Sequence, residues 1–203
     1  MKELLQGVSV CILLTVLTSA AMAEPKAGKQ TTHSVSLDVD GEKVDVGFHL
    51  YLPKNYDGES KVPLLLFLHG SGERGDDLGL VLKWGPPKHI SKGTDYPCVV
   101  LSPQCPADER WRPETLVQLV DWARGAFQID GSRMYVTGLS MGGTGTFALI
   151  DKYPKLFAAA VPICGAIETK QPERMADVPI RAFVGSEDQV VRKMVDLIKS
   201  VQD

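Results

Sequence analysis

Residues 133–150 read RMYVTGLSMGGTGTFALI and are the most informative segment for the fold class. Its first part, Arg133 to Thr137, has the composition of a buried strand, and Met141 to Tyr153 has the spacing of a helix. Ser140 lies between the two, with a glycine two residues to either side. Small neighbours of this kind allow a sharp turn from strand to helix. We therefore expect the Ser140 hydroxyl group to stand exposed at the end of a sheet, where a nucleophile belongs.

The N-terminal part of the expected domain has the pattern of a β-hairpin. Apolar and polar residues alternate over His33–Val39 and again over Val44–Leu52, as in strands with one buried face. Asp40 and Gly41 stand between the two segments, and this dipeptide is typical of tight hairpin turns. We expect an antiparallel pair that precedes the other strands.

Further along the chain, predicted strands and helices alternate. Residues 63–68 form a continuously apolar run that is too short for a helix, which predicts a central strand covered on both faces. A long loop rich in Gly, Asp and Pro follows it. The further elements that we expect are strands at 98–101, 156–163 and 179–184 and helices that begin at Pro113 and at about Val190. This alternation favours a doubly wound, mostly parallel α/β sheet with right-handed crossovers.

The bulk composition bounds the class of protein. The chain has 203 residues, of which 44% are hydrophobic, and a formal net charge of -3. These values fit one globular domain with a substantial core. The basic residues are scattered rather than clustered, so we expect no nucleic-acid partner.

The N-terminus has the pattern of a cleavable signal peptide. An apolar run extends from Val8 to Ala21, and Ala21-Met22-Ala23 has the small-x-small pattern of a cleavage site. The run is shorter than the roughly 20 residues of a membrane-spanning helix. We therefore expect cleavage after Ala23, a secreted or periplasmic protein, and no stable membrane insertion after cleavage. The expected organisation is a signal peptide at 1–23, a flexible lead-in at 24–32 and one folded domain at 33–203.

Cleavage would leave an odd number of cysteines in an oxidising compartment, namely Cys98, Cys105 and Cys164. One disulfide with one free thiol fits this count, and so do three buried thiols. The sequence has neither a CxxC pair nor a cluster of cysteines and histidines. We expect no metal site and no cofactor.

A serine nucleophile needs backbone N–H groups that stabilise negative charge on the carbonyl oxygen it attacks. The Met141 N–H, at the start of the helix, is one candidate. The second would come from the loop after strand 63–68, where Ser71 is our first choice and Gly72 the second. His69, at the end of the strand, is interpreted as a structural hydrogen-bonding residue rather than as a base.

The serine also needs a base, and the base needs an acid that orients it. Where such a serine turn occurs, the chain order is serine, acid, histidine. Asp188 follows the expected strand 179–184 and is our candidate acid, with Glu187 as the alternative, although either carboxylate could merely cap a helix. The sequence contains four histidines, all before Ser140: His33, His49, His69 and His89. None fits that order, and His89 would reach the serine only by a non-standard route.

Four blocks of the sequence resemble α/β-hydrolases of the bacterial predicted-peptidase and phospholipase/carboxylesterase branch, and are similar to feruloyl and polyhydroxybutyrate-depolymerase-like esterases. The blocks are LHGSGERGDD (68–77), SPQCP (102–106) followed by Trp111, GLSMGGTGTFAL (138–149) and FAAAVPICG (157–165). The resemblance implies the α/β-hydrolase fold, with a C-terminal part that bears the histidine. Against that pattern the chain is C-terminally incomplete and lacks the last strand and helix.

By this resemblance, Ser140 would be the nucleophile, Asp188 the acid of the triad, and the Met141 and Ser71 amides the oxyanion hole. Trp111 and the Glu73-Arg74 loop would shape the mouth of the pocket. The implied function is an exported serine hydrolase that forms an acyl-enzyme, with a small-molecule or polysaccharide-linked ester as substrate. The alternatives are a serine peptidase of the same fold and a catalytically inactive, hydrolase-like binding protein that lacks the triad histidine.

Overall fold

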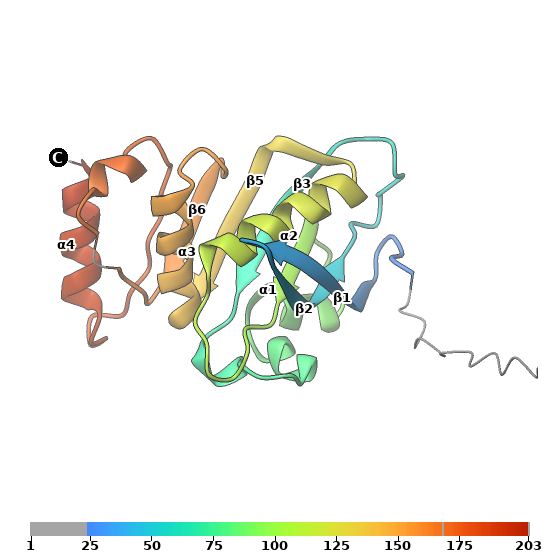
Figure 1. The fold of residues 1–203 in the computed structure, drawn as a ribbon, viewed down its shortest axis with the longest axis horizontal. Helices are drawn as coiled ribbons and strands as arrows, with labels where there is room; N and C mark the ends of the chain where they lie inside the picture. The colour runs from blue at the N-terminus through green and yellow to red at the C-terminus, as the bar shows by residue number, and fades with distance from the viewer. Residues whose placement is uncertain (1–23, 168, 203) are drawn as a thin grey trace, which may run out of the picture.

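The computed structural model of the protein describes residues 24–167 and 169–202. The expected signal peptide and its cleavage site lie outside these residues. One mixed sheet runs through the molecule (Figure 1), in the spatial order β1 (Gln30–Val39), β2 (Glu42–Tyr51), β4 (Val99–Pro103), β3 (Val62–Leu68), β5 (Ile129–Leu139) and β6 (Ala159–Ile163). β1 and β2 are antiparallel to their neighbours, and the other four strands are parallel. The predicted mostly parallel α/β sheet with an N-terminal hairpin is thereby confirmed.

β1 and β2 form the predicted hairpin and pair over their full length. Asp40 and Gly41 at its tip have φ angles of 54° and 86°, the left-handed backbone of a two-residue hairpin turn. β1 begins at Gln30, inside the segment 24–32 that we expected to lack regular structure. Its first residues complete the ladder opposite the end of β2, and this long-range pairing leaves no periodic signal in the sequence.

The parallel strands lie at the centre of the sheet, with β3 between β4 and β5. Leu64, Leu66 and Leu68 of β3 are fully buried, and every residue of β4 is buried. Burial on both faces explains why these strands read as continuous apolar runs. β5 begins at Ile129 and is longer than the expected segment 133–137.

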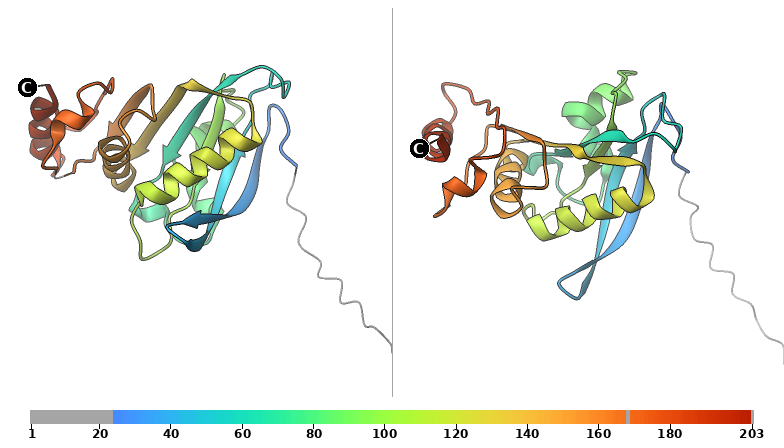
Figure 2. Two further views of the ribbon diagram at one scale, coloured as in Figure 1. Left: turned by 45° about the horizontal axis from the view of Figure 1, so that its top comes forward. Right: turned by 90° about the horizontal axis from the view of Figure 1, so that it is seen from above.

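Helices cover both faces of the sheet (Figure 2). On one face lie α2 (Pro113–Ala126) and α3 (Met141–Lys152), and on the other lies α1 (Gly85–Ser91). The segment between β3 and β4, which we expected to be a long loop, contains α1 and two 3-10 turns, η1 (Ser71–Glu73) and η2 (Leu78–Lys83). Short turns of this kind are compatible with a composition rich in Gly, Asp and Pro.

The C-terminal part departs from the expected regular strands. β6 begins at Ala159 rather than at residue 156. Residues 179–184 run beside β6 in the expected parallel direction and exchange four backbone hydrogen bonds with residues 160–164. Pro162 has no N–H to donate, so the ladder is interrupted and appears as two bridges, Ala160 with Ile180 and Ile163 with Phe183. After this segment comes α4 (Val191–Gln202), which packs against the 3-10 turn η3 (Pro172–Met175).

The main hydrophobic core lies between the sheet and the helices α2 and α3. Phe147, Leu149 and Ile150 of α3 and Leu116 and Leu119 of α2 are almost completely buried in it. The three cysteines Cys98, Cys105 and Cys164 are all free thiols. Over residues 24–167 and 169–202, no helix has the length and apolar character needed to cross a membrane.

Candidate active site

Ser140 occupies the turn between β5 and α3, as the sequence predicts. Its backbone angles, φ 56° and ψ -113°, lie outside the regions that ordinary residues adopt. Strain of this kind costs about 1–3 kcal/mol and persists only where the surrounding structure enforces it. The Ser140 N–H donates to the Ile163 carbonyl at 2.8 Å, and the side chain is exposed. The turn therefore presents the hydroxyl group at the carboxyl edge of the parallel strands, where α/β sheets bind ligands.

Two glycines make the turn sterically feasible. A Cβ atom at Gly138 would lie 2.2 Å from the Gly142 oxygen, and one at Gly142 would lie 1.9 Å from the Leu68 oxygen. Real Cβ atoms essentially never approach other atoms closer than 3.0 Å. Backbone contact with β3 and β5 thus fixes where α3 begins.

Met141, the predicted oxyanion donor, is the first residue of α3 and is buried. The first N–H groups of a helix have no partner within the helix, and the helix dipole makes this end attractive to negative charge. The Ser140 side chain does not cap α3. Both the hydroxyl group and the neighbouring helix end are therefore left for a ligand.

His69 has the structural role that we expected. It is 1% exposed, and its Nε2 accepts a hydrogen bond from the Cys105 N–H at 3.0 Å. Because Nε2 accepts, the proton of the neutral ring is on Nδ1, which donates to the Gly70 carbonyl at 2.6 Å. Burial lowers the pKa of His69 and so favours this neutral form. His69 thereby holds the end of β3 against residue 105.

The segment that follows, the Gly70 loop (residues 70–77), lies next to the serine. A Cβ built on Gly70 would lie 3.7 Å from the Ser140 Cβ and 3.5 Å from the Leu139 oxygen. Ser71 and Gly72, the predicted oxyanion donors, come directly after Gly70 in η1 and are exposed. The sequence therefore predicted correctly that this loop and the serine turn are neighbours in space.

The other predicted loop residues have different surroundings. Glu73 is buried, and one of its carboxylate oxygens lies 3.1 Å from the position of a Cβ on Gly70. Arg74 is half-buried and donates from Nε to the Ser71 carbonyl at 3.1 Å and from Nη1 to the Glu109 carbonyl at 3.2 Å. Arg74 thus connects the Gly70 loop to the segment that follows β4.

Asp188, the candidate acid, lies half-buried between the 179–184 segment and α4. Its Oδ1 accepts a hydrogen bond from the Val190 N–H at 3.0 Å, which closes a local turn just before α4 rather than capping the helix. The Cys164 thiol, at the end of β6, lies beside it: burial and then the Asp188 carboxylate raise the pKa of Cys164. The alternative acid, Glu187, is exposed.

The tip of β6 connects Asp188 with the serine turn. Cys164 has a φ angle of 52°, which is rare for a residue with a side chain, and its N–H donates to the Phe183 carbonyl at 2.8 Å. The preceding residue, Ile163, accepts from the Ser140 N–H. The nucleophile and the candidate acid therefore lie at the same edge of the sheet, on either side of this tip.

The remaining histidines lie in other parts of the structure. His33 and His49 are buried in the hairpin, where they bond to threonine hydroxyl groups, and His49 Nε2 donates to the Leu78 carbonyl at 2.9 Å. Burial lowers the pKa of both. His89 is exposed on α1. In the described ranges, no hydrogen bond joins any of these histidines to Ser140.

Trp111 is a buried packing residue behind the serine turn. Its Nε1 donates to the His69 carbonyl at 3.1 Å, and its ring meets the His69 ring edge-on at 4.7 Å. A Cβ on Gly145 of α3 would lie 2.8 Å from the Trp111 side chain. The side chain thus connects β3 with α3.

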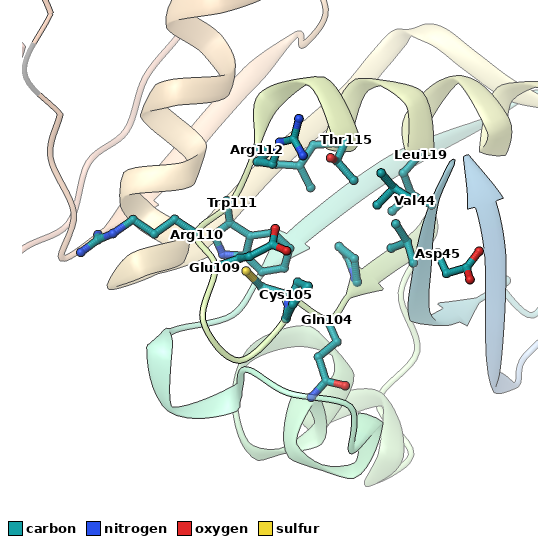
Figure 3. Close-up of a pocket in the computed structure, with 14 residues that line it drawn as sticks. Val44, Asp45, Gln104, Cys105, Glu109, Arg110, Trp111, Arg112, Thr115 and Leu119 are labelled. Atoms are coloured by element: carbon teal, nitrogen blue, oxygen red, sulfur yellow. The ribbon is translucent and has the colours of Figure 1, made fainter. Parts of the chain in front are cut away.

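The other side of Trp111 lines a cavity of about 40 Å³ between β2, α2 and the segment 103–112 (Figure 3). A cavity of this size has room for water but not for a substrate. Its lining includes neither Ser140, Glu73 nor Arg74. The predicted pocket residues are therefore not brought together at this cavity.

Sequence reasoning missed two residues that the structure puts beside the predicted ones. Gln104 follows β4 and bonds to the backbone of the Gly70 loop, and Cys164 lies beside Asp188. Both belong to sequence blocks that carried the resemblance, SPQCP and FAAAVPICG. Their position in those blocks indicated that they could belong to the site. The spacing of residues in the sequence did not show which parts of the chain they contact.

Known proteins resemble the chain both in sequence and in fold. The sequence profile of the prolyl oligopeptidase family matches residues 109–185. Acetylxylan esterase A from Emericella nidulans is 25% identical over 146 residues, which cover 63% of this chain and 45% of that protein. A thermostable esterase of known structure is 32% identical with a TM-score of 0.69, over 84% of this chain and 52% of its own. The feruloyl esterase module of Clostridium thermocellum, 15% identical, has a TM-score of 0.63 over 88% of this chain and 75% of its own, and supports the fold alone.

The extent of these matches defines what they establish. The chain spans about half the length of the first two esterases, 45% and 52%. The thermostable esterase matches 84% of this chain. The residues that match the prolyl oligopeptidase profile, 109–185, include the serine turn. Sequence, fold and the geometry at Ser140 agree: the chain has the α/β-hydrolase fold and is similar to esterases of that fold.

Proposed function

We propose that the protein is an exported carboxylic ester hydrolase that works through an acyl-enzyme on Ser140. The observation that carries this proposal is the strained, exposed turn at Ser140 beside the Gly70 loop. A hydroxyl group at the start of a helix and near a second set of backbone amides suits attack on a carbonyl group, because the charge that develops on the carbonyl oxygen meets N–H donors already in position.

In the proposed reaction, Ser140 Oγ attacks the carbonyl carbon of the ester while a base takes the hydroxyl proton. The electrons of the carbonyl double bond move onto its oxygen, which accepts hydrogen bonds from the N–H groups of Met141 and of Ser71 or Gly72. Collapse of this intermediate expels the alcohol, which receives the proton from the base. Water, deprotonated by the same base, then attacks the acyl-Ser140 ester, and the carboxylic acid and free serine are released.

Asp188 would orient the base, since it lies at the same edge of the sheet as Ser140. In this fold the base is a histidine that follows the acid in the chain, and the four histidines of this sequence all precede Ser140. Because the chain spans about half the length of the esterases that it matches, the proposal concerns the activity of the full-length protein.

The substrate class that we propose is an acyl ester on a polysaccharide, such as an acetyl or feruloyl group. Two sequence relatives support an acyl ester on a polysaccharide by their names, acetylxylan esterase A and a bifunctional acetylxylan esterase/xylanase. The exposure of Ser140 supports it as well, because an ester carried on a bulky polymer can approach a serine that stands at the surface. Export would bring the enzyme to such a polymer.

A serine peptidase is the second candidate. It is favoured by the match of residues 109–185 to the prolyl oligopeptidase profile. The same nucleophile and oxyanion donors can cleave an amide, so that the contacts around the leaving group decide between the two activities.

The test uses the full-length protein and a fluorophosphonate probe, with the labelled residue mapped by mass spectrometry. We expect labelling of Ser140 in the wild type and none in Ser140→Ala. Ser36→Ala is the matched control, because Ser36 is an exposed serine on the edge strand β1. Ester turnover should fall at least about a thousandfold in Ser140→Ala. In such a catalytic unit, loss of the nucleophile alone reduces the rate about as much as loss of all members together.

A substrate panel then separates the candidates: p-nitrophenyl acetate, methyl ferulate, acetylated xylan and peptide p-nitroanilides. Faster turnover of esters than of amides supports the proposal, and the reverse order supports the peptidase. If the full-length protein is neither labelled nor active on any of them, the hydrolase proposal is wrong and the catalytically inactive alternative is favoured.

A further inference from the structure

The SPQCP segment (residues 102–106) connects the end of β4 with the Gly70 loop. Gln104 directly follows β4 and is 7% exposed. Its backbone N–H donates to the Gly47 carbonyl at 2.9 Å and so attaches it to β2. Its side chain extends away from the sheet (Figure 3), and the residue is therefore anchored at one end while its amide group reaches another part of the chain.

That other part is the Gly70 loop. Gln104 Nε2 donates to the Glu73 carbonyl at 2.9 Å and to the Asp77 carbonyl at 2.8 Å. A primary amide has two N–H donors, so both are used on carbonyl groups of this loop. Glu73 ends η1, and Asp77 is the N-cap of η2. One buried side chain thus holds the loop at two points.

The neighbouring residue holds the same loop through its backbone. The Cys105 carbonyl accepts from the Gly75 N–H at 3.0 Å, and the Cys105 N–H donates to His69 at 3.0 Å. Ser71 and Gly72 lie between these attachment points and are themselves exposed. Their position relative to Ser140 therefore depends on bonds made from residues 104 and 105.

We propose that Gln104 is a positioning residue of the ester hydrolysis, which sets the place of the oxyanion donors on the Gly70 loop. This inference rests on the proposed function. Donors in a catalytic site must be held to within about 0.5 Å of the productive geometry by the residues behind them. Without the Gln104 amide, two carbonyl groups of the loop lose their partners and the segment between them is free to shift.

The test is Gln104→Met in the full-length protein, which keeps the length of the side chain and removes both donors. We expect kcat for p-nitrophenyl acetate to fall at least about tenfold, against about 10²–10³-fold for outright loss of an oxyanion donor. KM should change little, because the donors act mainly on the transition state. Hydrogen exchange should become faster at the amides of residues 71–77 and not across the rest of the sheet.

Gln118→Met is the matched control, because Gln118 is exposed on α2. It should leave kcat, KM and exchange unchanged. Unchanged kcat and exchange in Gln104→Met would overturn the proposal, and so would a loss of activity that only follows faster exchange throughout the molecule. A wild-type protein without turnover would refute the proposed function, and the exchange of residues 71–77 would then decide whether Gln104 holds the loop.

A second variant, Gln104→Glu, separates a hydrogen-bonding role of this side chain from a role in packing alone, because its effect should depend on pH. A carboxylate there would face the carbonyl oxygens of Glu73 and Asp77 and repel them, whereas a protonated carboxyl group donates one hydrogen bond. The ratio of its kcat to that of the wild type should therefore rise as the pH falls. A ratio that does not depend on pH would contradict the proposed role.

Discussion

The close contact at Gly142 yields the sharpest stability prediction. A Cβ added there would lie 1.9 Å from the Leu68 oxygen, 2.6 Å from the Leu68 carbonyl carbon and 2.8 Å from the His69 oxygen. These are backbone atoms at the end of a central strand, and they cannot rotate away as a side chain would. Gly142→Ala must therefore move the start of α3 away from β3.

The size of the effect follows from the distance. Real Cβ contacts begin at 3.0 Å, so the helix must withdraw by about 1 Å, and overpacking of a tight interior typically costs about 1–3 kcal/mol. The better helix propensity of alanine returns less than about 1 kcal/mol. For a net loss of about 1–2 kcal/mol, the melting temperature of a domain of this size should fall by about 2–8 °C.

Thermal unfolding followed by circular dichroism measures this change, with Gly125→Ala as the control. Gly125 also lies in a helix, α2, but a Cβ there would meet nothing within 4 Å. We expect Gly125→Ala to leave the melting temperature unchanged or to raise it. If Gly142→Ala melts at the wild-type temperature while the control behaves as expected, the argument that backbone contact fixes the serine turn is wrong.

Two further predictions concern pH and thiol chemistry. Burial lowers the pKa of His49 and His69 below 6.5, so the unfolded state binds more protons, and the free energy of unfolding should fall as the pH drops below about 6.5. His49→Gln should weaken this dependence of the urea midpoint, and an unchanged dependence would contradict the argument. Burial raises the pKa of Cys98 and Cys105 from 9.0 to about 11; native alkylation by iodoacetamide at about pH 8 should be about 100-fold slower than in urea. Rapid alkylation of Cys98 or Cys105 in the native protein, mapped by mass spectrometry, would contradict this expectation.

The serine turn could be predicted from the sequence because its causes are local. The apolar strand, the helix spacing and the glycines at 138 and 142 all lie within a short stretch, and each restricts the same few backbone angles. The position of the Gly70 loop beside Ser140 could be expected too. Both follow the ends of parallel strands, which meet at one edge of a sheet.

The elements that escaped prediction depend on contacts between distant residues. Residues 179–184 lie parallel to β6 as expected, but Pro162 of β6 has no N–H, so their pairing is not a regular ladder. β1 extends to Gln30 because β2 offers partners there. In both cases the neighbouring strand, rather than the periodicity of the segment itself, decides where regular pairing begins and ends.

Contacts between distant residues also explain what could not be predicted within the candidate site. Gln104 and the Glu73 carbonyl that it bonds are 31 residues apart, and no pattern of hydropathy records a side chain that bonds to a distant backbone. The resemblance implied that Trp111 shapes a pocket mouth, and the structure shows its ring packed between His69 and α3. An indole donor needs a partner when buried, and only the fold shows which carbonyl provides it.

The packing of Trp111 has a spectroscopic consequence. The sequence has three tryptophans, and Trp84 is 50% exposed whereas Trp111 is 9% exposed. Iodide or acrylamide should therefore quench the emission of Trp84 first and leave a protected component that includes Trp111. Since the Trp111 indole donates to the carbonyl of His69 and lies against α3, the wavelength of this protected emission is a native optical reporter of the arrangement behind the serine.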